Sequence, residues 1–117
     1  MVDDDASVRH SFSMLLSSRG YRITTAEDGY DALDKLLQEI PDLIISDLNM
    51  PRLNGYELLP LVRRRHPHIP IVVATGNAEQ TLPLADAMYV KGKDQPQDLM
   101  RTVAVLLKSD PLSLSNG

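Results

Sequence analysis

Cysteine is absent from the 117-residue sequence. Its absence excludes a disulfide framework, a thiolate nucleophile and any cysteine-based zinc site. Long hydrophobic runs are also missing, and a run such as Leu43-Ile44-Ile45 is far too short to span a bilayer. No signal-like segment opens the chain, so we expect a cytoplasmic protein that has no contact with the membrane.

Basic residues are fewer than acidic ones: the sequence has 12 lysines and arginines and 16 aspartates and glutamates, which gives a net charge of -4. Non-specific binding of nucleic acid needs a basic surface, so we expect no direct nucleic-acid partner. Three arginines do gather in residues 62–70, "VRRRHPHIP". We interpret them as cations at the C-terminus of a helix, where the helix dipole favours positive charge.

Segments with helical spacing of apolar residues alternate with short apolar runs along the chain. The length predicts one domain, which we place at residues 1–108, followed by a disordered tail at residues 109–117. The patterns predict helices within 6–19, 27–42, 56–66 and 94–109, and strands at 21–26, 43–46, 69–75 and 88–91. Because strands alternate with helices, we expect a parallel sheet covered by helices on both faces.

Chemically active side chains stand at the carboxyl ends of the predicted strands, where open α/β sheets bind ligands. They are Asp3 and Asp4 near the start of the chain, then Asp47, Thr75 and Lys91. The opening "MVDDD" has two interpretations: a frayed, solvated terminus, or a group of acids that waits for a cation. The acid, hydroxyl and ammonium at the other strand ends favour the second interpretation.

Converging carboxylates repel each other, and one would take up a proton unless a cation neutralised them. A set of carboxylate oxygens favours Mg²⁺, which keeps several waters and needs only one or two protein carboxylates. Asp47 ends the most buried predicted strand and is therefore the candidate nucleophile. Lys91 can hold a phosphoryl oxygen as a point charge, and Thr75 can donate a hydrogen bond to the same group. Together they indicate phosphoryl transfer onto aspartate.

Four motifs in order, "VDDD", "DLIISDLNMPRLNGYELL", "IPIVVATG" and "YVK", resemble the receiver domain of response regulators in two-component signalling. The resemblance covers about residues 2–108. It implies a flavodoxin-like, doubly wound, five-stranded parallel sheet with helices on both faces. It also implies a phosphoprotein of a phosphorelay that uses Mg²⁺.

The resemblance assigns a role to each strand-end residue. Asp47 would be the phosphoacceptor, with Lys91 and Thr75 as the other catalytic side chains. Asp4 would be the direct Mg²⁺ ligand beside Asp47, with Asp3 in support. The backbone carbonyl of Asn49 would complete the protein's share of the metal shell.

The resemblance also implies partners and limits. A histidine kinase or a histidine phosphotransfer protein would supply the phosphoryl group, and an unidentified downstream protein would read the result. Self-association as a homodimer is a further option. The chain would not be an enzyme beyond catalysing its own aspartyl phosphorylation and dephosphorylation. The alternative is a receiver-like protein-interaction module with impaired or no phosphorylation switching.

The chain departs from the family pattern in several places. Only Met1 and Val2 precede the acids, so we expect a short first strand, reduced stability and a truncated start. Pro83 lies where a helix interior would lose a hydrogen bond, so the fourth helix should be short or missing. Pro60 predicts that the third helix starts late or kinks. Asp5 should cap the first helix or be solvated, outside the site.

Two enzyme classes remain as rivals. A phosphatase of the haloacid-dehalogenase type would need a second acid two residues after the nucleophile, where this chain has Asn49. A flavodoxin-type nucleotide binder would offer hydroxyls and amides to phosphate after the first strand, where the three aspartates would repel it.

Overall fold

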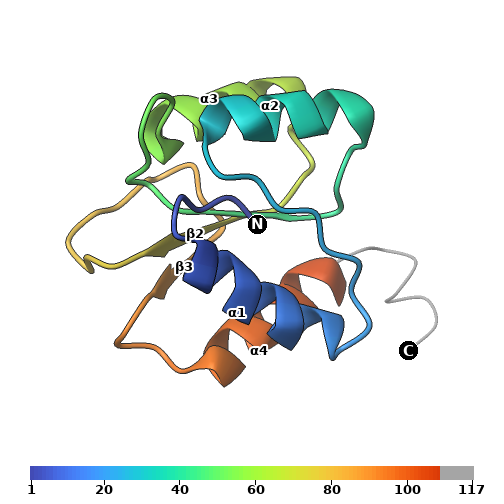
Figure 1. Cartoon of the computed structure of the whole chain (residues 1–117), viewed down its shortest axis with the longest axis vertical. Helices are drawn as coiled ribbons and strands as arrows, with labels where there is room; N and C mark the ends of the chain where they lie inside the picture. The colour runs from blue at the N-terminus through green and yellow to red at the C-terminus, as the bar shows by residue number, and fades with distance from the viewer. Residues whose placement is uncertain (109–117) are drawn as a thin grey trace.

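The computed structural model describes residues 1–108, which form three layers with a small parallel sheet in the middle (Figure 1). Helices α2 and α3 cover one face of the sheet, and α1 and α4 cover the other (Figure 1). In chain order the elements are α1 (Ala6–Ser17), α2 (Gly29–Gln38), β1 (Ile44–Ser46), α3 (Gly55–Arg65), β2 (Ile71–Thr75), β3 (Ala87–Val90) and α4 (Pro96–Lys108). The predicted tail, residues 109–117, lies outside the described residues.

The sheet pairs β1 with β2 and β2 with β3, all parallel. Beyond β1, Val2 forms single parallel bridges to both Ser46 and Ala26. The order across the sheet is therefore the segment ending at Ala26, then Val2, β1, β2 and β3, which is the doubly wound order expected for this fold class. The predicted fold class is confirmed.

The predicted number of strands is wrong for the part of the chain that the structure describes. Three of the five expected positions are hydrogen-bonded strands, and the other two are reduced to the bridges of Val2. Val2 bonds to the β1 side, where its N–H donates to the Ile45 carbonyl and its carbonyl accepts from the Asp47 N–H. On the other side, the Met1 carbonyl accepts from the Ala26 N–H, and the Asp3 N–H donates to the Ala26 carbonyl. Residues 21–25 form no strand, and in this segment only Ala26 pairs with Val2.

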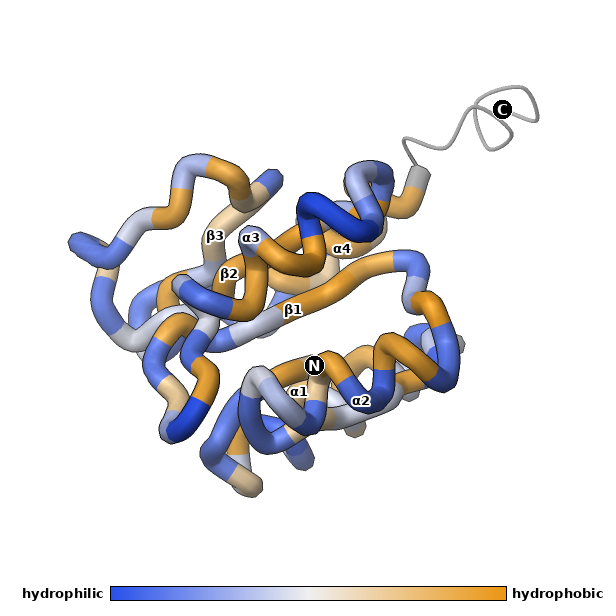
Figure 2. Tube along the Cα trace, turned by 90° about the horizontal axis from the view of Figure 1, so that it is seen from above, coloured by the Kyte–Doolittle hydropathy of each residue, from blue (hydrophilic) through white to orange (hydrophobic). Residues whose placement is uncertain are grey.

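Alternating side chains of the strands build two hydrophobic cores, one on each face of the sheet. Ile44, Ile71 and Val73 pack toward α2 and α3, whereas Ile45 and Val72 pack toward α1 and α4. Figure 2 shows β1 as a hydrophobic segment in the middle of the molecule. Because β1 and β2 are buried on both faces, the part of the site at their ends rests on a rigid base.

The helix ends mostly follow the sequence signals. Asp5 is the N-cap of α1 and accepts hydrogen bonds from the N–H groups of Ser7 and Val8, which confirms the capping role. Helix α3 begins directly after Asn54, which forms a capping box with Glu57. Of the two outcomes that Pro60 predicts, the late start is wrong, because Pro60 lies inside a helix that already begins at Gly55. The kink stays a prediction.

Between β2 and β3, residues 76–86 form turns and no helix. The predicted short or missing fourth helix is thus confirmed as a missing one. Figure 1 shows this segment as a long loop at the edge of the sheet where the strands end. Within residues 1–108, no helix is both long and apolar enough to cross a membrane.

Candidate functional site

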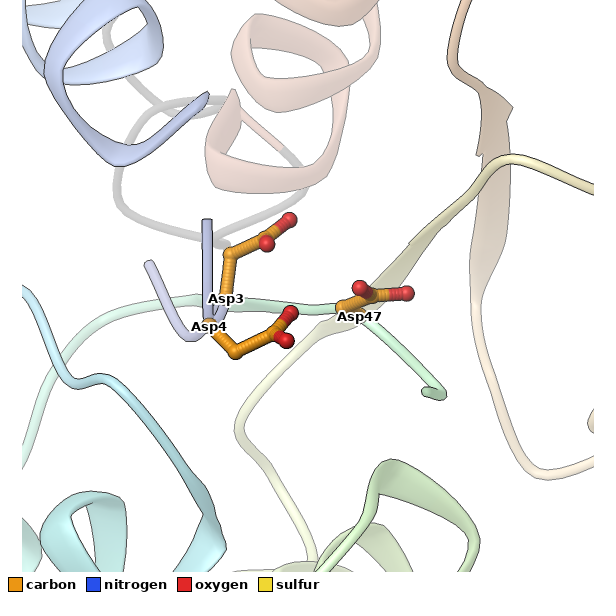
Figure 3. A group of neighbouring side chains, drawn as sticks. All are labelled: Asp3, Asp4 and Asp47. Carbon is orange, nitrogen blue, oxygen red and sulfur yellow. The ribbon is translucent and has the colours of Figure 1, made fainter. Parts of the chain in front are cut away.

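The predicted strand-end residues gather at one edge of the sheet. Asp3 and Asp4 follow the bridge at Val2, and Asp47 follows β1. Thr75 is the last residue of β2, and Lys91 comes directly after β3. Figure 3 shows the three acids side by side at this edge.

Asp47 is held in a fixed orientation by backbone and side-chain donors. One carboxylate oxygen, Oδ1, accepts from the N–H groups of Leu48 at 2.7 Å and Asn49 at 3.3 Å. The other, Oδ2, accepts from Lys91 Nζ at 3.3 Å. Burial raises the pKa of Asp47 above its usual value, and the charge of Lys91 and the Asn49 N–H offset only part of that rise. A further cation would therefore stabilise the charged form of this buried carboxylate.

Asp3 is fully buried, and its carboxylate already has partners. Its Oδ2 accepts from Lys91 Nζ at 2.9 Å, and its Oδ1 accepts from the Asp5 N–H at 2.9 Å. Burial alone would lower the pKa of Lys91, but the hydrogen bond and charge of Asp3, and then Asp47, raise it above its ordinary value. Lys91 thus stays an ammonium and ties the two buried acids together.

Asp4 differs from the other two acids because it is exposed. Within residues 1–108, its carboxylate has no protein hydrogen-bond partner, so both of its oxygens are open to an incoming ligand. Asp3, Asp4 and Asp47 can each offer one oxygen, and these atoms lie within 4.8 Å of one another. Mg²⁺ binds carboxylate oxygens and retains waters in the rest of its octahedral shell, so this cluster fits a Mg²⁺ site.

Thr75 lies at the same edge, but its hydroxyl forms a hydrogen bond with Gln80, a residue that the sequence did not indicate. Thr75 is fully buried, and its Oγ1 donates to Gln80 Oε1 at 2.7 Å. The side chain of Gln80 also pairs with the side chain of Asn49. Gln80 lies in the loop that replaces a helix, and no sequence signal for its position exists, because its contacts depend on how that loop folds back.

The loop after Asp47 is fixed by close packing. Gly55 sits against the backbone of the site: a Cβ at this position would lie 2.3 Å from the carbonyl oxygen of Asp47 and 2.8 Å from Leu48 Cα. Arg52, whose φ is 66°, forms an ion pair with the buried Asp28 at the N-terminus of α2. The loop between Asp47 and α3 is therefore fixed by two contacts, the packing of Gly55 on the Asp47 backbone and the ion pair of Arg52 with Asp28.

Gly55→Ala is expected to lower the free energy of unfolding by about 1–3 kcal/mol, because the new methyl group overlaps the Asp47 backbone. Denaturant unfolding measures the change. Gly76→Ala is the matched control, since a Cβ at Gly76 meets no atom within 4 Å. Equal stabilities of the two variants would show that the Gly55 contact is not tight.

The chain belongs to a known family, because residues 1–95 match the model of the response regulator receiver domain. It is 34% identical over 110 residues to the DNA-binding transcriptional regulator NtrC of Klebsiella pneumoniae, an alignment that covers 91% of this chain and 23% of NtrC. The chain thus spans about a quarter of the length of that relative.

Solved structures agree with the family. The response regulator TrrA of Thermotoga maritima, in complex with Mg²⁺ and beryllofluoride, is 30% identical with a TM-score of 0.82, covering 90% of this chain and 94% of TrrA. The chemotaxis protein CheY4 of Vibrio cholerae is 34% identical with a TM-score of 0.79, covering 90% and 93%. The chain is a receiver domain of the response-regulator class, consistent with a phosphoacceptor function in two-component signalling, and its acid cluster fits Mg²⁺.

Proposed function

We propose that residues 1–108 form a receiver domain in which Asp47 accepts the phosphoryl group. The observation that carries the proposal is that a buried carboxylate lies beside one ammonium, at 3.3 Å from Lys91 Nζ, and two further acids. In the transfer, a carboxylate oxygen of Asp47 forms a bond to phosphorus, and the bond between phosphorus and the donor's leaving group breaks. The leaving group keeps the electron pair.

Each neighbouring residue has a separate task in this proposal. Mg²⁺, when bound by Asp4, Asp47 and the backbone carbonyl of Asn49, supplies positive charge to the phosphoryl oxygens. Asp3 supports that site and holds Lys91, whose ammonium neutralises a phosphoryl oxygen at the same time. Thr75 donates a hydrogen bond from its hydroxyl to the phosphoryl group once its bond to Gln80 is broken.

The proposed partners follow from the family. Receiver domains of response regulators interact with histidine kinases and downstream effectors. For this chain we propose a histidine kinase or histidine phosphotransfer protein in the cytoplasm as donor. A protein target would read the result, either directly or through a homodimer, without direct contact between this domain and nucleic acid. The domain would catalyse only its own phosphorylation and dephosphorylation.

A second candidate is a receiver-like interaction module that switches poorly. The loop at residues 76–86, which stands where a helix was expected to be short or missing, favours it, because a helix moves as one body and a loop does not. Uptake of a phosphoryl group without any change in the amide spectrum of this loop would support the module over the switch.

Asp4→Asn is expected to weaken Mg²⁺ binding by roughly tenfold or more, since even outer-shell changes at metal sites have effects of this size. Calorimetric titration with Mg²⁺ measures the Kd. Asp5→Asn is the matched control: it removes the same charge one residue away, and asparagine caps a helix as well as aspartate does. Equal losses in the two variants would indicate a general charge effect and contradict a ligand role for Asp4.

A further inference from the structure

The hydroxyl of Thr75 is already engaged in a hydrogen bond with Gln80 rather than with Asp47. Its Oγ1 donates to Gln80 Oε1 at 2.7 Å and accepts from the Asn77 N–H at 3.2 Å. A threonine hydroxyl carries one proton, so it cannot donate to a second acceptor at the same time. In this conformation Thr75 has no proton to offer to a group on Asp47.

Gln80 is held in place by a second pair of hydrogen bonds. Its Oε1 also accepts from Asn49 Nδ2 at 2.8 Å, and its Nε2 donates to Asn49 Oδ1 at 3.1 Å. The Asn49 N–H in turn donates to Asp47 Oδ1. One glutamine amide therefore joins the end of β2 to the loop that carries the acceptor.

We propose that Gln80 is a positioning residue that holds the Thr75 hydroxyl in an off orientation until a phosphoryl group arrives on Asp47. This inference rests on the proposed function of Asp47. A phosphoryl oxygen is anionic and accepts a stronger hydrogen bond than a neutral amide oxygen does, so it can draw the Thr75 proton away from Gln80. Gln80 then competes with the phosphoryl group for one proton.

The exchange also has a consequence for the surface of the molecule. Once Thr75 turns away, the Gln80 side chain keeps only its bonds to Asn49, while the Gln80 backbone N–H still donates to the Asn77 carbonyl. The Asn77 N–H loses its bond to Thr75 Oγ1. Both Asn77 and Gln80 lie in the loop of residues 76–86, whose far end is tied by the ion pair of Asp86 with Arg63. Phosphorylation would thus release the near end of this loop while the far end stays fixed.

Beryllofluoride, which imitates a phosphoryl group on the acceptor, tests the competition by calorimetry in the presence of Mg²⁺. Gln80→Ala removes the competing acceptor and is expected to tighten beryllofluoride binding roughly three- to tenfold, the effect of about one neutral hydrogen bond. Glu79→Ala is the matched control, because Glu79 is exposed and contributes only its backbone N–H to the loop. It should bind as the unaltered chain does.

A double-mutant cycle shows whether the effect passes through Thr75. In a Thr75→Ala background, Gln80→Ala should leave the beryllofluoride Kd unchanged, since there is no proton to compete for. Without beryllofluoride, Gln80→Ala should also move the amide resonance of Asn77 toward its position in the beryllofluoride complex of the unaltered chain. A role of Gln80 in stability alone would produce neither result.

Three outcomes would overturn the inference: an unchanged or weaker affinity of Gln80→Ala, an equal gain in the Thr75→Ala background, or an Asn77 resonance that does not move toward the complex. Failure of the unaltered chain to bind beryllofluoride with Mg²⁺ is a separate result, which would contradict the proposed function of Asp47 itself.

Discussion

Asp47→Asn is expected to abolish phosphoryl uptake from acetyl phosphate. An amide cannot form the acyl phosphate, and the other two acids of the cluster are poorly suited to replace it. Asp3 has both oxygens in hydrogen bonds, and Asp4 is exposed and, unlike Asp3 and Asp47, forms no ion pair with Lys91 in the described residues. The protein should still fold, because the amide oxygen can accept the hydrogen bonds that Leu48 and Asn49 now donate.

Gel electrophoresis with a phosphate-binding matrix would measure the uptake after incubation with acetyl phosphate and Mg²⁺. Asp42→Asn is the matched control, since Asp42 is exposed and lies five residues before the acceptor. We expect a shifted band for the unaltered chain and for Asp42→Asn, and none for Asp47→Asn. A shifted band of equal intensity for Asp47→Asn would place the acceptor on another residue.

The second large effect concerns the start of the sheet, where the structure has a cavity of about 370 Å³. Its lining is mainly apolar and includes Met1, Ile23, Leu43 and Ile45. The register of Val2 opposite Ala26 and Ser46 places a residue ahead of Met1 between the backbones of Thr24 and Ile44.

Met1, which carries the N-terminal ammonium, lines this cavity. The ammonium donates to the Thr24 carbonyl at 3.0 Å, and burial, followed by the charge of Lys35, lowers its pKa to about 6. A charged group whose pKa is lowered by folding reduces stability at neutral pH, because the folded state holds the proton less tightly than the unfolded state does. Replacing this ammonium by a peptide bond would remove that penalty.

An extension of four apolar, β-branched residues ahead of Met1 is therefore expected to raise the free energy of unfolding by about 2 kcal/mol. Burial of each apolar side chain stabilises the fold by about 1.5–3 kcal/mol, and the conformational entropy lost when each residue is ordered cancels most of that gain. For a domain of this size the gain corresponds to a rise in Tm of roughly 8–16 °C.

Thermal unfolding followed by circular dichroism measures the change in Tm. An extension of the same length made of glycine and serine is the control, because it removes the ammonium but fills no apolar volume. A Tm of the apolar extension equal to that of the control would mean that the cavity does not accept a strand.

The acceptor edge could be predicted from the sequence because it depends on topology. The carboxyl ends of parallel strands meet at one edge, so Asp47 after an apolar run and Lys91 after another had to converge. No side-chain detail was needed for that inference. The family motifs then gave a role to each position, which the geometry accommodates.

The features that the sequence predicted wrongly or missed depend on interactions in the folded protein, which a local sequence pattern does not show. Residues 21–26 alternate as a strand does, yet they find only Val2 to pair with. Pro60 is tolerated inside α3 because the carbonyl that loses its partner, that of Tyr56, belongs to an exposed residue of the first turn. Gln80 reaches Thr75 only through the fold of a loop, which spacing alone does not reveal.

Intact-mass spectrometry of the unaltered chain, incubated with acetyl phosphate in Mg²⁺ or in excess chelator, tests the central claim most directly. We predict the added mass of one phosphoryl group in Mg²⁺, its near absence in chelator, and its recovery from a peptide that contains Asp47. No added mass in Mg²⁺, or the same added mass in chelator, would contradict a Mg²⁺-dependent aspartyl acceptor.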